Sequence, residues 1–234
     1  MDKLIYIRKS KRAKRIIFRV EPLKGIEVVV PNNISKFQAN KVILRQSKSK
    51  WFKDAFKQIE KYREQLNPTE VTIGYPYETW LISYQEHLVG QKPYIIETAA
   101  NCLKVTRDLS DSMLHINLLR QWHQGKAEKI LVPLVKDLSF TNNIGFNKLK
   151  IKLQKNSWGS CSAKKNINLN RNLIFLSKNL IEYVILHELC HTKILSHSSG
   201  FWEILEQYLP KWKGDKTDLC LIDRERVPAW AMAE

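Results

Sequence analysis

The sequence predicts an α+β protein that combines a mixed sheet with long helices. Three observations predict this class: β-branched segments separated by turn signals, two long segments of helical periodicity, and an apolar helical segment in the C-terminal half. With 234 residues, the chain can form one sizeable domain or two small ones around a real core. We expect a basic N-terminal region over residues 1–143 and a second region over residues 144–234.

The first part of the chain is expected to form strands followed by one long helix. Three β-branched segments are separated by a basic turn at residues 10–15 and by a Pro/Gly turn at residues 22–25. Apolar residues then recur at helical spacing from about Ser35 to Leu66, where Asn67-Pro68 ends the pattern. The strands are expected near residues 4–7, 16–20 and 26–30.

More strands and a second long helix are expected next. A hairpin is a candidate at residues 87–91, and the helix is expected from Asp111 to about Asn142, with Gly125 and Pro133 as positions where it could bend. The strands are expected near residues 71–73, 79–84 and 94–107.

The C-terminal half alternates short strands with helices. Strands are expected at residues 149–153 and 167–176, with a loop at residues 158–162 between them. Three helices are expected after these strands, at residues 180–195, from Ser199 to Pro210 and around residues 216–226.

The region over residues 144–234, which we expect to be the catalytic region, contains the pattern His-Glu-x-x-His, from His187 to His191. On a helix, two histidines four residues apart project from one face and can occupy two corners of a tetrahedral Zn²⁺ site. Glu188 would flank the metal and could take a proton from a metal-bound water. The apolar neighbours of the motif make a solvated face unfavourable, so the pattern predicts a zinc-hydrolase helix of the zincin type.

A catalytic zinc ion commonly has three protein ligands, so a third ligand is expected nearby. His197 is the preferred candidate, because a Ser/Gly cluster after the helix lets the chain turn back toward the metal. Glu203 and Glu206 are the alternatives, since another class of zinc peptidase takes its third ligand from a glutamate on the next helix. His87, His115 and His123 lack ligand spacing and are expected to be surface or half-buried histidines.

These motifs resemble the YgjP-like (DUF45) metallopeptidase family over roughly residues 148–210. The segments that carry the resemblance are Trp-Gly-Ser-Cys-Ser at 158–162, Ile-Asn-Leu-Asn at 167–170, the segment 183–191, and His-Ser-Ser-Gly-Phe-Trp at 197–202. The resemblance implies a cytoplasmic zinc metalloprotein with His187, His191 and His197 as ligands and Glu188 as general base. It also implies a relation to the Wss1-like and SprT-like proteases.

Two positions depart from the related patterns. Ser157 stands where the family commonly has a basic residue, which leaves a substrate contact open. Ile194 stands where metzincins have their turn glycine, which argues against a true metzincin.

Composition narrows the functional classes further. The four cysteines are widely spaced, which is typical of reduced thiols, and neither a leader nor an apolar stretch of membrane-spanning length is evident, so we expect a cytoplasmic protein that does not enter membranes. Residues 1–66 hold 18 Lys and Arg against 6 Asp and Glu, most of the excess behind the net charge of +16. This region could contact a polyanion such as nucleic acid or a nucleotide, or be a solvated basic surface.

The sequence therefore predicts a zinc-dependent metallopeptidase in which Glu188 activates a zinc-bound water for attack on a protein or peptide substrate. Residues 166–175 are expected to be the strand whose edge receives the substrate. Two alternatives are a metal-dependent phosphohydrolase of nucleoside triphosphates and a basic binding module with structural zinc. The last would require a fourth ligand such as Cys161 or Cys190.

Overall fold

The chain forms two compact units, Met1–Pro68 and Thr69–Met232, in a computed structural model. Together their helices and strands form the α+β architecture that the sequence predicts. The division of function between residues 1–143 and 144–234 stays a prediction. The structure describes residues 5–21, 25–64, 66–88, 90–108, 111, 113–210 and 226–232, except for the side chains of residues 61–64.

The first unit packs two helices against one face of a three-stranded sheet. The strand order is β1-β3-β2, with β1 parallel and β2 antiparallel to the central strand. The central strand is buried along its whole length, and its alternate residues Ile26, Val28 and Val30 form one core cluster with Phe52 and Ile59. The elements are β1 (Ile5–Ser10), β2 (Ile17–Glu21), β3 (Gly25–Pro31), α1 (Lys36–Gln46) and α2 (Lys50–Glu64).

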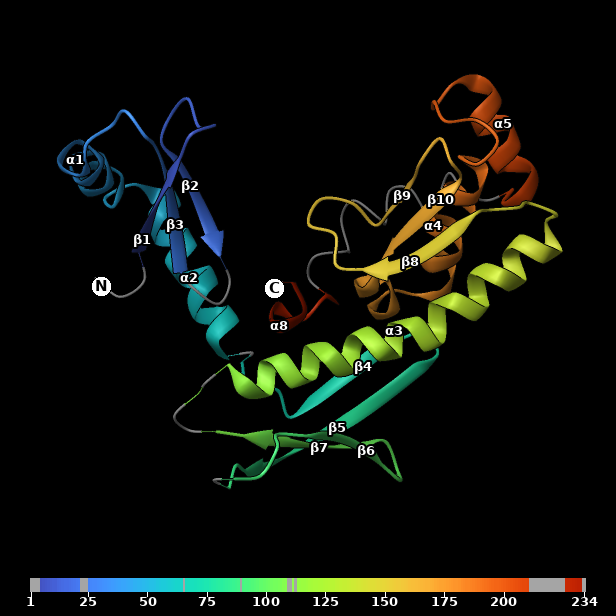
Figure 1. The fold of residues 1–234 in the computed structure, drawn as a ribbon, viewed down its shortest axis with the longest axis horizontal. Helices are drawn as coiled ribbons and strands as arrows, with labels where there is room; N and C mark the ends of the chain where they lie inside the picture. The colour runs from blue at the N-terminus through green and yellow to red at the C-terminus, as the bar shows by residue number, and fades with distance from the viewer. Residues whose placement is uncertain are drawn as a thin grey trace. The chain divides into compact units, whose positions relative to one another are not determined.

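The predicted single helix from Ser35 to Leu66 was wrong, because α1 and α2 are separate helices (Figure 1). The interruption lies at Ser47–Ser49, where two serines compete for backbone hydrogen bonds. Ser47 donates its hydroxyl to Leu44 O, and the Ser49 hydroxyl accepts from the N–H of Phe52 in the first turn of α2. A periodic apolar pattern that continues across such a break does not reveal it.

The second unit begins with a four-stranded sheet in the order β4-β5-β7-β6. The segment predicted as one strand at residues 94–107 is two strands, joined by a turn in which Ala100 and Asn101 have positive φ angles of 62° and 52°. The predicted hairpin at residues 87–91 was also wrong, because β5 pairs in parallel with β7. The strands are β4 (Glu70–Gly74), β5 (Tyr77–Glu86), β6 (Ile95–Thr98) and β7 (Cys102–Arg107).

The long helix α3 (Leu114–Thr141) organises the second unit. Figure 1 shows it running along the four-stranded sheet, with the strands β8 (Lys148–Lys152) and β10 (Asn166–Asn170) and the helix α4 (Lys178–Cys190) on its other side. Ten of its residues are buried. The long helix that the sequence predicts up to about Asn142 is present, and Pro133 lies inside it. It therefore forms the layer that supports the C-terminal elements.

The C-terminal sheet has the order β8-β10-β9. The predicted loop at residues 158–162 is in part a short strand, β9 (Gly159–Cys161), which pairs antiparallel with β10 (Asn166–Asn170). On its other side β10 pairs in parallel with β8 (Lys148–Lys152). The prediction that residues 166–175 present a free strand edge was therefore wrong, because β10 is paired on both sides and the chain then turns into the short helix η2 (Arg171–Phe175).

The remaining described elements surround the predicted zinc helix. Helix α4 (Lys178–Cys190) is buried at nine of its thirteen residues, as its apolar sequence predicts. Helix α5 (Ser199–Tyr208) follows, and α8 (Ala229–Met232) places the fully buried Trp230 against α3. The predicted helix at residues 216–226 lies almost wholly outside the described residues. Among the described helices, none has the length and apolar character needed to cross a membrane.

Candidate active site

Three histidine side chains meet at the C-terminal end of α4. His187 lies in the last turn of the helix and His191 is its C-cap residue. The Nε2 atoms of these two residues are 3.1 Å apart. His197 comes back from the following turn, and its Nε2 lies 3.1 Å from that of His191 and 3.0 Å from that of His187. The structure thus brings together the three residues that the sequence selected.

Mutual hydrogen bonding does not account for this triangle of nitrogens. A neutral imidazole carries one N–H, and that N–H can point at only one partner, so three nitrogens at these distances cannot all be satisfied by one another. A tetrahedral zinc ion with bonds of about 2.0–2.1 Å to three imidazoles holds their nitrogens roughly 3.3 Å apart. The spacing of 3.0–3.1 Å is close to that value, so the three residues fit a metal ion.

A backbone contact fixes the tautomer of His191. Its Nδ1 lies 3.0 Å from the carbonyl oxygen of Ile194, which can only accept, so Nδ1 carries the proton and Nε2 presents a lone pair toward the triangle. Burial lowers the pKa of His191, which favours the same neutral form. Both effects prepare the ring to bind a cation.

The turn after α4 explains how His197 reaches the other two histidines. The predicted helix over residues 180–195 ends earlier, at Cys190, because the hydroxyl and the backbone N–H of Thr192 both donate to Leu189 O. The N–H groups of Lys193 and Ile194 then both donate to Cys190 O. This tight turn reverses the chain within a few residues.

Aromatic rings from α5 hold the histidine rings in place. Phe201 is fully buried and stacks on His191, with centroids 4.4 Å apart. Trp202 stacks on the more exposed His197, with centroids 5.5 Å apart and planes 23° apart. The direct contact of these two aromatic rings with the candidate ligands was not predictable from the sequence pattern of this helix.

Glu188 is buried beside the triangle and is 6% exposed. Burial raises the pKa of its carboxyl group to about 8. Gly159 of β9 lies directly against it: a Cβ atom at position 159 would be 2.6 Å from both Cγ and Oε1 of Glu188. The glycine therefore leaves the space that the carboxylate occupies, a role that the sequence alone did not reveal.

The strand β9 runs past Glu188 at the edge of its sheet. Trp158 O accepts from the N–H of Asn170, and the N–H of Ser162 donates to Asn166 O. Because backbone groups alternate along a strand, those of Gly159 and Cys161 point away from β10. Burial and the nearby Glu188 carboxylate raise the pKa of the Cys161 thiol. In the described part of the chain, the open backbone edge nearest Glu188 therefore belongs to β9.

The alternative ligands lie apart from this cluster. Glu203 and Glu206 are exposed on α5 and do not belong to the group of potential ligands formed by the three histidines. Contrary to the prediction, His115 and His123 are buried in α3, being 2% and 0% exposed. His123 donates from Nε2 to Arg171 O, and burial lowers its pKa to about 3, so it is a neutral core residue.

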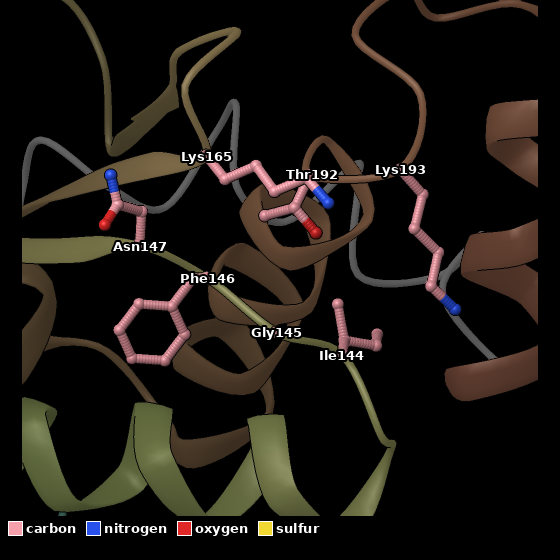
Figure 2. A pocket seen from close by; sticks show the side chains of 7 residues that line it. All are labelled: Ile144, Gly145, Phe146, Asn147, Lys165, Thr192 and Lys193. Atoms are coloured by element: carbon pink, nitrogen blue, oxygen red, sulfur yellow. The ribbon is translucent and has the colours of Figure 1, made fainter.

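A separate pocket of about 310 Å³ borders the turn after α4 (Figure 2). Its walls come from the segment before β8, from Lys165 between β9 and β10, and from Thr192 and Lys193. The three histidines and Glu188 do not line it. The pocket is thus a feature beside the histidine cluster and not the cluster itself.

A comparison with protein-family models identifies the family of the chain. The model of a family described as YgjP-like, metallopeptidase domain, matches residues 14–220. The chain belongs to this YgjP-like metallopeptidase family. It therefore carries a metallopeptidase domain, and the histidine triangle is a possible site for a metal ion of this domain.

Two solved structures are also similar to part of this YgjP-like chain. The metallopeptidase zymogen jannalysin of Methanocaldococcus jannaschii is 30% identical over 41% of this chain and 96% of its own, with a TM-score of 0.35. The metallopeptidase zymogen abylysin of Pyrococcus abyssi is 26% identical over 40% of this chain and 96% of its own, also with a TM-score of 0.35. A search of curated proteins finds no match.

Proposed function

We propose that the chain is a zinc peptidase in which His187, His191 and His197 hold the ion and Glu188 is the general base. The observation that carries the proposal is the triangle of three Nε2 atoms 3.0–3.1 Å apart, with the buried carboxyl group of the adjacent residue beside it. An all-imidazole set favours zinc over Mg²⁺ or Ca²⁺, which prefer oxygen ligands.

An open coordination position favours catalysis over a purely structural ion. Within the described ranges, the cluster of potential ligands contains the three histidines and no cysteine or carboxylate. Structural zinc sites are closed by four protein ligands, whereas catalytic sites keep one position for water or substrate. Cys161 and Cys190, the candidates for a closed site, are free thiols outside this cluster.

In this proposal the residues divide the work of hydrolysis between them. A zinc ion at the site would lower the pKa of a bound water to about 7 and polarise the substrate carbonyl. Glu188 takes a proton from the attacking water and delivers it to the leaving amine. A nearby cation would lower the raised pKa of Glu188 toward neutral pH. A pKa in that range suits a group that must both accept and release a proton.

The open edge of β9 is the proposed position of the substrate backbone. An extended peptide can pair with the outward backbone groups of Gly159 and Cys161 as an added strand. Because Gly159 touches Glu188, a peptide on this edge would bring its scissile bond close to the general base. The substrate would thus be recognised mainly through its main chain.

The test combines metal content with hydrolysis of fluorescein-labelled denatured casein. The unaltered chain should retain about one zinc per chain, His197→Ala should lose most of it, and the control His87→Ala should retain it. Glu188→Gln should keep the metal and lose hydrolysis. A chain that stays metal-free when zinc is supplied, or a fully active Glu188→Gln variant, would refute the mechanism.

A further inference from the structure

The first unit carries most of the net positive charge of the protein, and this charge is unevenly distributed within the unit. From residue 3 to residue 53 the chain holds 15 Lys and Arg but only two acidic residues, Glu21 and Glu27. Glu27 is buried and pairs with Arg8 at 2.6 Å, and Glu21 ends β2, where it pairs in register with Gly25. The opposite end of the sheet, where β1 ends and β2 begins, therefore has no acidic side chain in its loop.

Two exposed basic segments lie at that end of the sheet, and the first is the loop between β1 and β2. Residues 11–16 cross the end of β3, because Ser10 pairs with Pro31 on one side and Ile17 with Val29 on the other. The hydroxyl of Ser10 accepts from the N–H groups of Arg12 and Ala13, which shapes the start of this loop. Lys11, Arg12, Lys14 and Arg15 are all exposed in it.

The start of α1 lies at the same end. The chain leaves β3 at Pro31 and enters α1 at Lys36, and the ammonium group of Lys9, near the end of β1, donates to Ile34 O in this connection. Lys36 is exposed, and the next residue, Phe37, is 80% exposed. An exposed aromatic ring thus lies at the same end of the sheet as the basic loop.

We propose that this surface, formed by Lys11, Arg12, Lys14, Arg15, Lys36 and Phe37, binds single-stranded nucleic acid. The cations would contact phosphates, and the exposed ring of Phe37 would stack on a base. Aromatic rings among phosphate-binding cations are typical of surfaces for single strands, because unpaired bases expose their faces. The binding surface is distinct from the histidine cluster of the second unit.

The continuation of α1 favours nucleic acid over an anionic membrane. One side of α1 carries residues spaced three or four apart, namely Phe37, Lys41 and Leu44. The same spacing continues to Lys48, just beyond the end of the helix. Leu44 is 68% exposed. Apolar and cationic side chains alternate along this line, whereas a helix that lies in a membrane interface needs a continuous apolar face.

The proposal is tested on the full-length chain by fluorescence anisotropy with a labelled single-stranded DNA of about 20 nucleotides. Replacing Lys11, Arg12, Lys14 and Arg15 by Gln should weaken binding on the order of 100-fold at low salt. The slope of log K against log salt should become about 3 units shallower, since each lost phosphate contact contributes roughly 0.7. Phe37→Ala should weaken single-strand binding roughly 5-fold or more at an unchanged slope.

A matched control distinguishes the effect of this surface on binding from the effect of a lower net charge. Lys104, Lys129, Lys136 and Lys148 are exposed in the second unit, and replacing them by Gln removes the same charge. This control variant should bind within about 3-fold of the unaltered chain, and circular dichroism should show all variants folded. Equal losses in the two quadruple variants would overturn the proposal. Binding confined to phosphatidylserine vesicles, with no DNA binding, would overturn it in favour of a membrane surface.

Discussion

Gly159 lies so close to Glu188 that a Cβ atom at position 159 would be 2.6 Å from the carboxylate oxygen Oε1. Real Cβ atoms do not approach other heavy atoms this closely, so one of the two residues must move if a side chain is added. Glu188 is fixed in a buried helix, and β9 is held by its ladder to β10. The contact therefore couples the proposed general base to β9, the strand whose edge is proposed to bind the substrate.

The first prediction concerns this contact. Gly159→Ala should displace the Glu188 carboxyl group, or β9, by several tenths of an ångström and lower kcat/KM about 100-fold or more, because proton transfer depends on position. Zinc content should stay unchanged, since the three histidines are not touched. Gly145→Ala is the control, because a Cβ there meets nothing within 4 Å. Full activity of Gly159→Ala would contradict the proposed role of this contact.

The second prediction concerns the pH dependence of the metal-free protein. The pKa of Glu188 is raised to about 8 in the fold, so between its unfolded value and pH 8 the native state binds more protons than the unfolded state. Stability contributed by the neutral carboxyl group is therefore present at low pH and lost as the pH rises toward 8. The loss is on the order of 5 kcal/mol at most, because the pKa rises from 4.5 to about 8 and each pKa unit corresponds to about 1.4 kcal/mol.

Glu188→Gln removes this titration and provides the measurement. In denaturant unfolding of the metal-free chain, the variant should be more stable than the unaltered protein at pH 9 and similar to it at pH 5. Added zinc should reduce the difference at pH 9, because a cation stabilises the carboxylate. An equal difference at both pH values would mean that the carboxyl group titrates normally in the fold.

The local part of the site could be predicted from the sequence, because it depends on short separations along one helix and one turn. His187 and His191 share a face by helical geometry, and His197 lies close in the chain. The role of β9 could not be predicted in this way. The strand β9 has only three residues, one of them Gly159, which is too short to show a hydrophobic periodicity. The alternation at residues 167–176, by contrast, suggested a longer strand than the structure has.

Long-range polar contacts were the other feature that the pattern did not reveal. The side chain of Asn170, which is 4% exposed, donates to Gln154 O at 2.8 Å and to Ser157 O at 3.0 Å. These contacts tie the segment before β9 to the end of β10. In the sequence, Asn170 is one of several alternating asparagines, and nothing local distinguishes it from Asn168.

The third prediction follows from this difference between the two asparagines. Asn170→Asp replaces the donating amide by an oxygen that faces two carbonyl oxygens, so it should lower the free energy of unfolding by about 2–4 kcal/mol. It should also reduce peptidase activity, because β9 loses its anchor. Asn168→Asp is the matched control, since the Asn168 amide donates to the exposed Ser160 hydroxyl, and it should cost less than about 1 kcal/mol. Similar costs for the two variants would show that the buried contacts contribute little.

The fourth prediction concerns Trp202, whose ring stacks on His197. His197 is the most exposed of the three candidate ligands, so it has the least packing to hold its orientation. Trp202→Ala should weaken zinc binding about 10-fold or more in a chelator competition, because the groups that orient a ligand affect metal affinity to that extent. Trp202→Phe keeps a ring for stacking and should restore most of the affinity. Trp51→Ala, which removes a partly exposed indole from the first unit, should leave zinc affinity unchanged. If Trp202→Ala lowered only the thermal stability and left zinc affinity within 2-fold, the ring would be a packing residue of α5 and His197 would be oriented by the turn alone.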